Sequence, residues 1–308
     1  MPRDIAESVS EGVAALHSNT AGGRIRFRTD SPYITIKAEM PEVCRFPHMP
    51  LTGTTGFDAY RTYGKDRIYV GTFVPPNESE RGYTSKIGGG FIGEGDYIIN
   101  MPLYNDVSKV YIGIKKGAKM IKSVSKYINA APIVYYGSSI TQGGCASRPG
   151  NCYQNIISRR LNRDYINLGF SGSAQAEQPM IDYIKTLDMS VFVYDYDHNA
   201  PTPEYLKQTH KYMFDEIRGA KPELPIIMIS RPNAFVYPDT QRRLDIIRET
   251  FECAKKNGDK NVYMIDGGEM MRKFCGNDGT VDNTHPNDFG FRAMAEEIGG
   301  CLEKILNL

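Results

Sequence analysis

The sequence predicts a chain of two parts, a small β-sandwich followed by an α/β domain with a parallel sheet. Up to about residue 114, short stretches alternate between apolar and polar residues and are separated by glycine and proline turns, as in half-exposed antiparallel strands. From residue 132 onward, short apolar runs alternate with longer segments of helical spacing, which is typical of a parallel sheet flanked by helices. The length of 308 residues also suggests one large domain or two. We therefore expect one domain over residues 1–125 and a second over 126–308.

In the first part, apolar residues at positions 5, 9, 13 and 16 predict a helix, and Gly22-Gly23 marks a stop beyond it. The runs typical of strands then cover residues 24–28, 33–37, 67–73, 96–100 and 107–114. Turn-forming stretches at 75–77 and 88–90 separate several of them. Many short strands at this spacing predict a small β-sandwich.

In the second part, predicted strands and helices alternate along the chain. The strands are expected at 132–136, 164–168, 190–194, 225–229 and 261–265, and the helices at 151–162, 177–186, 203–218, 239–257 and 288–305. Ligands of open α/β sheets bind beyond the carboxyl ends of the strands. The loops that follow the strands are therefore the places to look for a site.

Ser139 lies in such a loop, just after the apolar run that ends at Tyr136. Serine and glycine are also ordinary turn residues, so the loop alone is equally consistent with a plain turn. Far along the chain, Asp282 precedes His285 by three residues, a spacing at which a carboxylate can orient and polarise an imidazole. Such an imidazole can take the proton of a serine, so the three residues are candidates for a nucleophile, base and acid triad.

Four segments in one order resemble the SGNH hydrolases, also called GDSL-type esterases. They are Gly137-Ser138-Ser139-Ile140-Thr141, then Asn167-Leu168-Gly169-Phe170-Ser171-Gly172, then Tyr196-Asp197-His198-Asn199, and finally Asp282-x-x-His285. The sequence departs from the family pattern in two places: Ser138 replaces the usual aspartate, and Tyr196-Asp197-His198 replaces the usual Gly-x before Asn199. The resemblance implies a flavodoxin-like, three-layer α/β/α hydrolase domain.

The amino-terminal part resembles that of one SGNH group, which carries Arg-Phe-x-Thr-Asp-Ser and Gly-x-Asp-Leu-Tyr motifs. Residues 26–31 fit the first motif, and residues 56–60 fit the second except for Ala59. The resemblance covers nearly the whole chain and implies a jelly-roll-like accessory domain.

The resemblance also implies three donors to an oxyanion: the backbone N–H groups of Ser139 and Gly172 and the side-chain amide of Asn199. The alternative for Gly172 is a turn glycine, and for Asn199 a loop cap. Four further residues in loops on the same face are candidate substrate contacts, namely Arg148, His198, Arg231 and Asn233. Surface solvation is the common fate of such residues, and His198 could equally hold its loop.

Composition excludes several function classes. Hydrophobic residues make up 41% of the chain and charged residues 24%, as in an ordinary globular protein. The net charge of +1 does not indicate binding to nucleic acid or to an anionic membrane. No run of roughly 18 apolar residues predicts a membrane span. The six cysteines have neither Cys-x-x-Cys nor zinc spacing, so we expect reduced thiols and no metal. With no apolar signal segment visible we expect a cytoplasmic protein, or a secreted one if such a segment was trimmed.

These observations predict a serine esterase that needs no cofactor and acts on short acyl esters, with O-acetyl groups on carbohydrate as the expected substrate. The expected partner is a small-molecule or oligosaccharide ester, and a homo-oligomer is compatible with the sequence. Three alternatives remain open: a lysophospholipase or thioesterase, an acyltransferase with the same triad, and a carbohydrate-binding protein on a decayed hydrolase fold.

Overall fold

The computed structural model describes residues 1–90, 92–128, 131–234 and 237–308, and contacts group the chain into two compact units. The α/β unit comprises Met1–His17, Ala130–Gln142 and Arg163–Leu308, and the β unit comprises Ser18–Asn129 and Gly143–Asn162. Residues 143–162, which follow the Ser139 loop in sequence, thus belong to the β unit by their contacts. The expected domain boundary after residue 125 stays a prediction.

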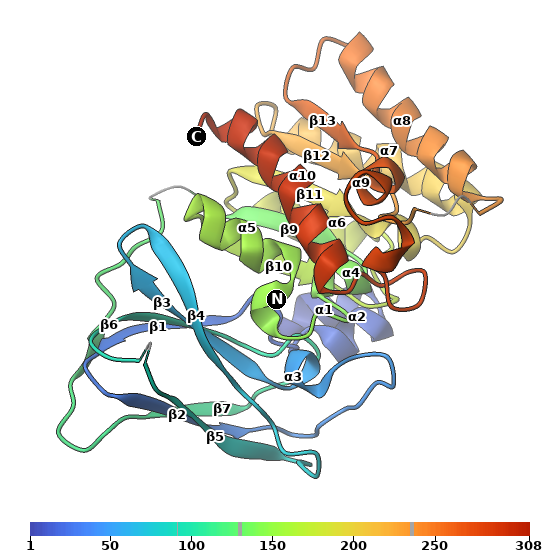
Figure 1. The fold of residues 1–308 in the computed structure, drawn as a ribbon. Helices are drawn as coiled ribbons and strands as arrows, with labels where there is room; N and C mark the ends of the chain where they lie inside the picture. Colours follow the sequence, from blue (N-terminus) through green and yellow to red (C-terminus); the bar gives the residue numbers. More distant parts are fainter. Residues whose placement is uncertain (91, 129–130, 235–236) are drawn as a thin grey trace. The chain divides into compact units, whose positions relative to one another are not determined.

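A parallel five-stranded sheet forms the centre of the α/β unit (Figure 1). Its strands are β9 (Ile133–Gly137), β10 (Tyr165–Gly169), β11 (Val191–Asp195), β12 (Ile226–Ile229) and β13 (Val262–Ile265). They lie in the order β10-β9-β11-β12-β13, and all four pairings are parallel. With the first strand second in the sheet, this is the doubly wound order 2-1-3-4-5 of flavodoxin-like folds. The predicted fold class is confirmed, and each strand lies within one residue of its predicted run.

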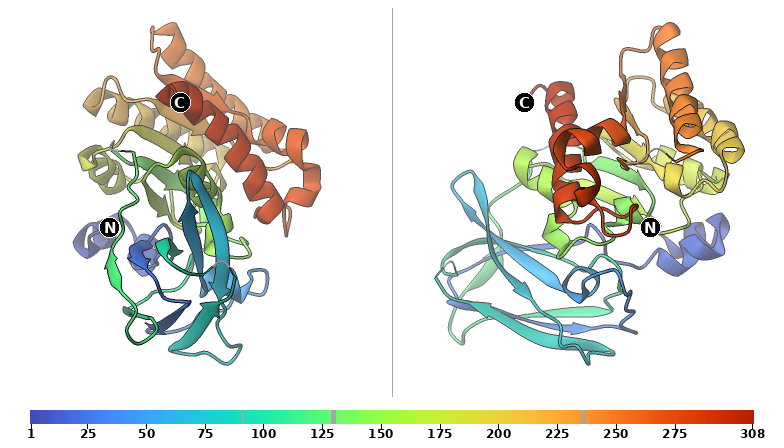
Figure 2. Two further views of the ribbon diagram at one scale, coloured as in Figure 1. Left: turned by 60° about the vertical axis from the view of Figure 1, so that its left-hand side comes forward. Right: turned by 45° about the vertical axis from the view of Figure 1, so that its right-hand side comes forward.

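Helices cover both faces of this sheet. They are α1 (Arg3–Val9), α2 (Glu11–Leu16), α4 (Ser139–Gln142), α6 (Gln178–Thr186), α7 (Pro203–Ala220), α8 (Thr240–Lys256), α9 (Gly267–Phe274) and α10 (Asp288–Leu306). Apolar side chains of α6, α7 and α8 form one buried cluster with alternate residues of the strands, such as Val134, Tyr136 and Phe192. Helix α10 lies on the opposite face (Figure 2). No helix among the described residues is both long and apolar enough to cross a membrane.

Two features of this unit differ from the predicted elements. The predicted helix over 5–16 is two helices, because Ser10 is extended and its hydroxyl caps α2 by accepting from the Val13 N–H. Helix α9 is not predicted, since Gly267-Gly268 at its start argues against a helix. A Cβ on Gly267 would overlap the Ser230 carbonyl, so close packing explains that glycine.

The β unit contains two antiparallel sheets. One has the order β4-β3-β6-β1-β8 and the other β5-β2-β7. The strands are β1 (Arg24–Thr29), β2 (Tyr33–Glu39), β3 (Phe57–Tyr63), β4 (Asp66–Phe73), β5 (Gly82–Gly88), β6 (Gly95–Asn100), β7 (Lys109–Gly113) and β8 (Met120–Lys122), with helices α3 (Leu51–Thr54) and α5 (Tyr153–Leu161). Residues of both sheets, among them Ile34, Ile36, Phe57 and Ile99, share one buried apolar cluster. Sheets that share a core in this way form a sandwich.

Strands β3, β5 and β8 are not among the predicted ones. The first four residues of β3 are all buried, so the strand lacks the apolar–polar alternation by which half-exposed strands are identified. Its ladder with β4 is also irregular between Ala59 and Tyr60.

Asp58, the acidic residue of the Gly-x-Asp-x-Tyr stretch, anchors residues 143–162 within the β unit. Its side chain is fully buried, and it accepts hydrogen bonds from Arg148 Nη1 at 2.6 Å, the Gly150 N–H at 2.8 Å and Asn100 Nδ2 at 2.7 Å. Arg148 also donates to the Tyr60 hydroxyl at 2.6 Å. A buried carboxylate is tolerated when charge and donors surround it in this way.

We expect Asp58→Ala to destabilise the protein by about 3–5 kcal/mol, because it leaves the largely buried Arg148 without its counter-charge. Urea unfolding followed by circular dichroism measures the loss. The matched control is Asp66→Ala, which removes an exposed carboxylate from the start of β4. Equal transitions for the two variants would contradict the anchoring role.

Candidate active site

Three strand ends of the α/β unit lie level at one edge of its sheet. Gly137, the last residue of β9, is in register with Gly169 of β10 on one side and with Asp195 of β11 on the other. The loops after these strands begin with Ser138, Phe170 and Tyr196. The first, second and third sequence blocks therefore leave the sheet side by side.

The Ser139 loop turns sharply into the short helix α4. The Ser138 hydroxyl accepts from the Ile140 N–H at 3.2 Å, and the Ser138 carbonyl accepts from the Gln142 N–H at 3.0 Å. A serine hydroxyl is a good cap for a helix start, as an aspartate would be, and this accounts for the departure at position 138. Ser139 itself is only 7% exposed.

A chain of hydrogen bonds links the three predicted triad residues. Ser139 Oγ lies 2.8 Å from His285 Nε2, and His285 Nδ1 lies 2.8 Å from Asp282 Oδ2. An ionised carboxylate can only accept, so the Nδ1 atom carries the proton in this arrangement. The lone pair of Nε2 is then left to accept the serine proton, which is the geometry that general-base activation needs.

The loop that carries Asp282 and His285 is held by its own backbone. Asp282 Oδ1 accepts from the N–H groups of Thr284 at 3.1 Å and His285 at 2.8 Å, which makes an Asx turn. Asn283 adopts a left-handed conformation with φ +63°, which asparagine tolerates better than most residues. Partial burial alone would raise the pKa of Asp282, but the donors from His285 and Thr284 outweigh it and lower that pKa. Asp282 therefore stays ionised near neutral pH.

The two other predicted oxyanion residues lie in the loops after β10 and β11. Gly172 has φ +70° and open space where a side chain would stand, so its backbone can be approached closely. Asn199 donates from Nδ2 to the Phe170 carbonyl at 2.9 Å, which joins the two loops. An amide group has two N–H bonds, so this contact leaves one for a ligand.

The four predicted substrate contacts have different surroundings. Arg148 belongs to the β unit, where Asp58 and Tyr60 engage it. Arg231 donates to buried Asp197 at 3.2 Å, and Asn233 Nδ2 donates to the Asn283 carbonyl. Through that bond Asn233 supports the loop between Asp282 and His285.

His198 has a buried Nε2 atom with no hydrogen-bond partner among the described residues. Burial, followed by the positive charge of Arg231, lowers its pKa to about 3. The imidazole is therefore neutral at physiological pH and adds no charge beside His285.

Asp195 is a residue of the site that the sequence analysis did not single out. It is buried, and it accepts from the Thr141 hydroxyl and the Ser138 N–H, one on each side of Ser139. Its Oδ2 atom has no hydrogen-bond partner within the described ranges. Burial raises the pKa of Asp195 to about 7 against the opposing effect of these donors. The available signal is a carboxylate that directly follows the predicted strand over 190–194.

Asp195→Asn is expected to stabilise the protein increasingly as pH rises from about 4 to about 7. In this window the unfolded chain releases the Asp195 proton while the folded chain retains it, so the wild-type protein loses stability as pH rises. The variant lacks this loss, and its advantage should level off above pH 7 at on the order of 4 kcal/mol.

Denaturant unfolding of both proteins between pH 4 and 8 measures the difference. Asp188→Asn, which changes an exposed carboxylate just before β11, is the control. A stability difference for Asp195→Asn that does not depend on pH would contradict the raised pKa.

Comparison with solved structures finds several similar folds. A putative GDSL-like lipase from Bacteroides ovatus is 29% identical, with a TM-score of 0.88 over 98% of this chain and 90% of that chain. The salicylyl-acyltransferase SsfX3 of a tetracycline biosynthetic pathway is 19% identical, with a TM-score of 0.75 over 96% of this chain and 86% of that one. A family two carbohydrate esterase from Clostridium thermocellum is 16% identical, with a TM-score of 0.67 over 94% of each chain.

Comparison with curated protein sequences finds no significant match. Two family profiles match the sequence: that of the N-terminus of SGNH hydrolase-type esterases over residues 1–120, and that of the GDSL-like Lipase/Acylhydrolase family over residues 130–303. The second covers more than half of the chain, and together they confirm the resemblance seen in the sequence motifs. The chain therefore belongs to the GDSL-like lipase/acylhydrolase family of carboxylic ester hydrolases, and it carries the N-terminal domain of the SGNH esterase type.

Proposed function

We propose that this protein hydrolyses short-chain acyl esters, with O-acetyl groups on carbohydrate as the substrate class, through an acyl-enzyme on Ser139. The observation that carries the proposal is the hydrogen-bond chain from Asp282 through His285 to Ser139, with 2.8 Å at each step. A serine hydroxyl is a weak nucleophile near neutral pH, and an oriented imidazole within hydrogen-bond reach removes that weakness.

In the first half of the reaction, Ser139 Oγ attacks the ester carbonyl carbon while His285 Nε2 takes the hydroxyl proton. The carbonyl oxygen becomes an oxyanion, for which we assign the Ser139 and Gly172 N–H groups and the Asn199 side-chain amide as donors. The ionised Asp282 stabilises the imidazolium that forms. His285 then gives the proton to the leaving alkoxide, and the acyl group remains on Ser139.

In the second half, a water molecule replaces the alcohol. His285 takes a proton from the water as its oxygen attacks the acyl carbon, and the same donors stabilise the second oxyanion. Collapse of the intermediate breaks the bond to Ser139 Oγ, which regains its proton from His285. We assign Arg231 and Asn233 to positioning the surrounding loops, and Arg148 to holding residues 143–162, rather than to substrate contact.

Two observations support short acyl groups on a polar substrate. Among the described residues, the large exposed apolar side chains close in sequence to Asp282 and His285 are Val281 and Phe289. Single apolar side chains suit a small acyl group or the face of a sugar ring better than a long chain. In addition, a solved structure of similar fold is a family two carbohydrate esterase in complex with cellohexaose. At 16% identity this likeness shows the fold alone, so its substrate enters here only as analogy.

A second candidate function is acyl transfer to an alcohol. It is favoured by the similar fold of the salicylyl-acyltransferase SsfX3. The same triad and oxyanion donors serve either reaction, because the acyl-enzyme is common to both and only the acceptor differs.

Ser139→Ala is expected to lower kcat for ester hydrolysis on the order of 10⁴–10⁶-fold, because it removes the nucleophile. Hydrolysis of nitrophenyl acetate measures the loss. The matched control is Ser138→Ala, which removes only the neighbouring hydroxyl cap and should cost at most about tenfold. Hydrolysis that survives in Ser139→Ala at the wild-type rate would refute the mechanism.

Acetate release from a panel of acetylated oligosaccharides tests the substrate class, together with nitrophenyl esters of increasing acyl length. We expect kcat/KM to be highest for acetyl esters and to fall as the acyl chain lengthens. A rise toward long chains would favour a lipase or lysophospholipase instead. If an added alcohol acceptor outcompetes water for the acyl group, the enzyme is an acyltransferase.

A further inference from the structure

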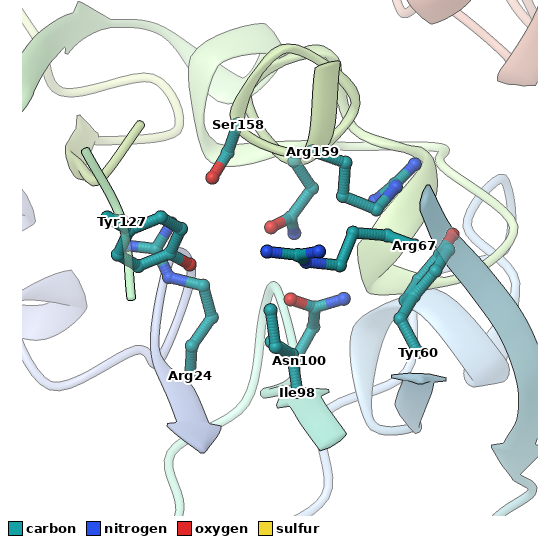
Figure 3. Close-up of a pocket in the computed structure, with 9 residues that line it drawn as sticks. Arg24, Tyr60, Arg67, Ile98, Asn100, Tyr127, Ser158 and Arg159 are labelled. Atoms are coloured by element: carbon teal, nitrogen blue, oxygen red, sulfur yellow. The ribbon is translucent and has the colours of Figure 1, made fainter. Parts of the chain in front are cut away.

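A second, small pocket lies within the β unit and is lined by three arginines (Figure 3). Arg67 reaches into its middle, Arg24 and Tyr127 line one side, and Tyr60 and Arg159 line the other. The cavity has a volume of about 10 Å³, room for one water-sized occupant. No aspartate or glutamate is among the described residues that line it.

The guanidinium groups of Arg67 and Arg159 have no carboxylate partner in the described part of the chain. Within the described ranges, Arg67 donates only to neutral oxygens, those of Ser125 Oγ and Asn162 Oδ1 at 3.1 Å and the Asp66 carbonyl at 3.4 Å. Arg159 lies over the Tyr60 ring at 4.1 Å, and its buried Nη1 atom has no hydrogen-bond partner among the described residues. Buried donors without acceptors and buried like charges both oppose folding, so a compensating ligand is expected.

Neighbouring charges do not cancel this positive field. Arg26 adds a further guanidinium, 4.2 Å from the centre of the Tyr127 ring. Of the nearest carboxylates, Asp96 is paired with Arg28 at 3.0 Å and Asp58 with Arg148 at 2.6 Å. Burial first, and then the charge of Arg26, lower the pKa of Arg67, against weaker opposing effects of Tyr127 and Asp96. The pocket is thus a confined site of positive charge lined by donors.

We propose that this pocket is a binding site for a single small inorganic anion of halide size, held by Arg67 and Arg159. The pocket is lined by residues of β1, β3, β4, β6 and α5, so the anion connects helix α5 to the larger antiparallel sheet within the β unit. A halide is a single spherical ion that accepts several N–H donors at once, and its size is closer to one water-sized occupant than that of a phosphate or sulfate. The site is separate from the proposed esterase reaction and uses none of its residues.

Thermal unfolding of the full-length protein in sodium chloride or bromide tests the site, with sodium gluconate at equal ionic strength as the reference salt. A ligand that binds only the folded state raises the unfolding temperature with its concentration. We expect the halide-specific rise to be roughly 3 °C for each tenfold increase above the dissociation constant.

The variant Arg159→Met should lose this rise, because it keeps an apolar stem and removes the charge. The matched control is Arg160→Met, which removes an exposed arginine from the next position of α5 and should keep the rise. If Arg159→Met does not fold, Arg67→Met takes its place in the same comparison.

Crystals soaked in bromide give a test that requires no variant. The expected result is an anomalous scattering peak within hydrogen-bond distance of Arg67 and Arg159. A halide response that is equal in wild type and the pocket variant, or bromide-soaked crystals without a peak in the pocket, would overturn the proposal.

Discussion

The close approach of the ends of β9 and β11 is the constraint on which the active site depends. Gly137 lies level with Asp195, and any side chain at position 137 would overlap the Asp195 carboxylate and the Thr141 hydroxyl. Glycine lets the two strands and the first turn of α4 pack together at this edge. Because α4 begins two residues after the end of β9, Ser139 lies directly beside the loops that follow β10 and β11.

Buried polar groups, rather than apolar contacts, fix these loops beyond the sheet. Asp195 accepts hydrogen bonds from Ser138 and Thr141, which lie on either side of Ser139 in sequence. Asp197 accepts from both Arg231 and Arg243, and Arg243 also donates to the Ala200 carbonyl at 3.0 Å. Each buried carboxylate thus accepts hydrogen bonds from several donors that water would otherwise satisfy, and its loss would free a whole loop. Positioning of this kind is what a triad needs, since small displacements of reacting groups are costly in rate.

The sequence predicts the sheet well because its strands are encoded in local patterns, and the pattern that suggests the proposed triad is local in part. Each strand of the parallel sheet is a short apolar run, and Asp282 and His285 share one short loop. The support around them could not be predicted in the same way. Asn233 holds Asn283 from 50 residues away, and nothing in its neighbourhood in sequence indicates that contact. Strand β3 was missed for the opposite reason: burial on both faces removes the alternation that identifies a half-exposed strand.

Residues 143–162 belong to the β unit by their contacts, although they follow Ser139 in sequence. The family profiles divide the chain between residues 120 and 130, yet these later residues complete the β unit. Of the three donors that Asp58 has among the described residues, two come from this segment, Arg148 and the Gly150 N–H. A Cβ on Gly150 would overlap the Asp58 carboxylate. Without that segment, Asn100 would be the one donor left to this carboxylate among the described residues. The Gly-x-Asp-x-Tyr stretch therefore binds the segment that follows Ser139, and residues from within the match to the hydrolase family complete the β unit.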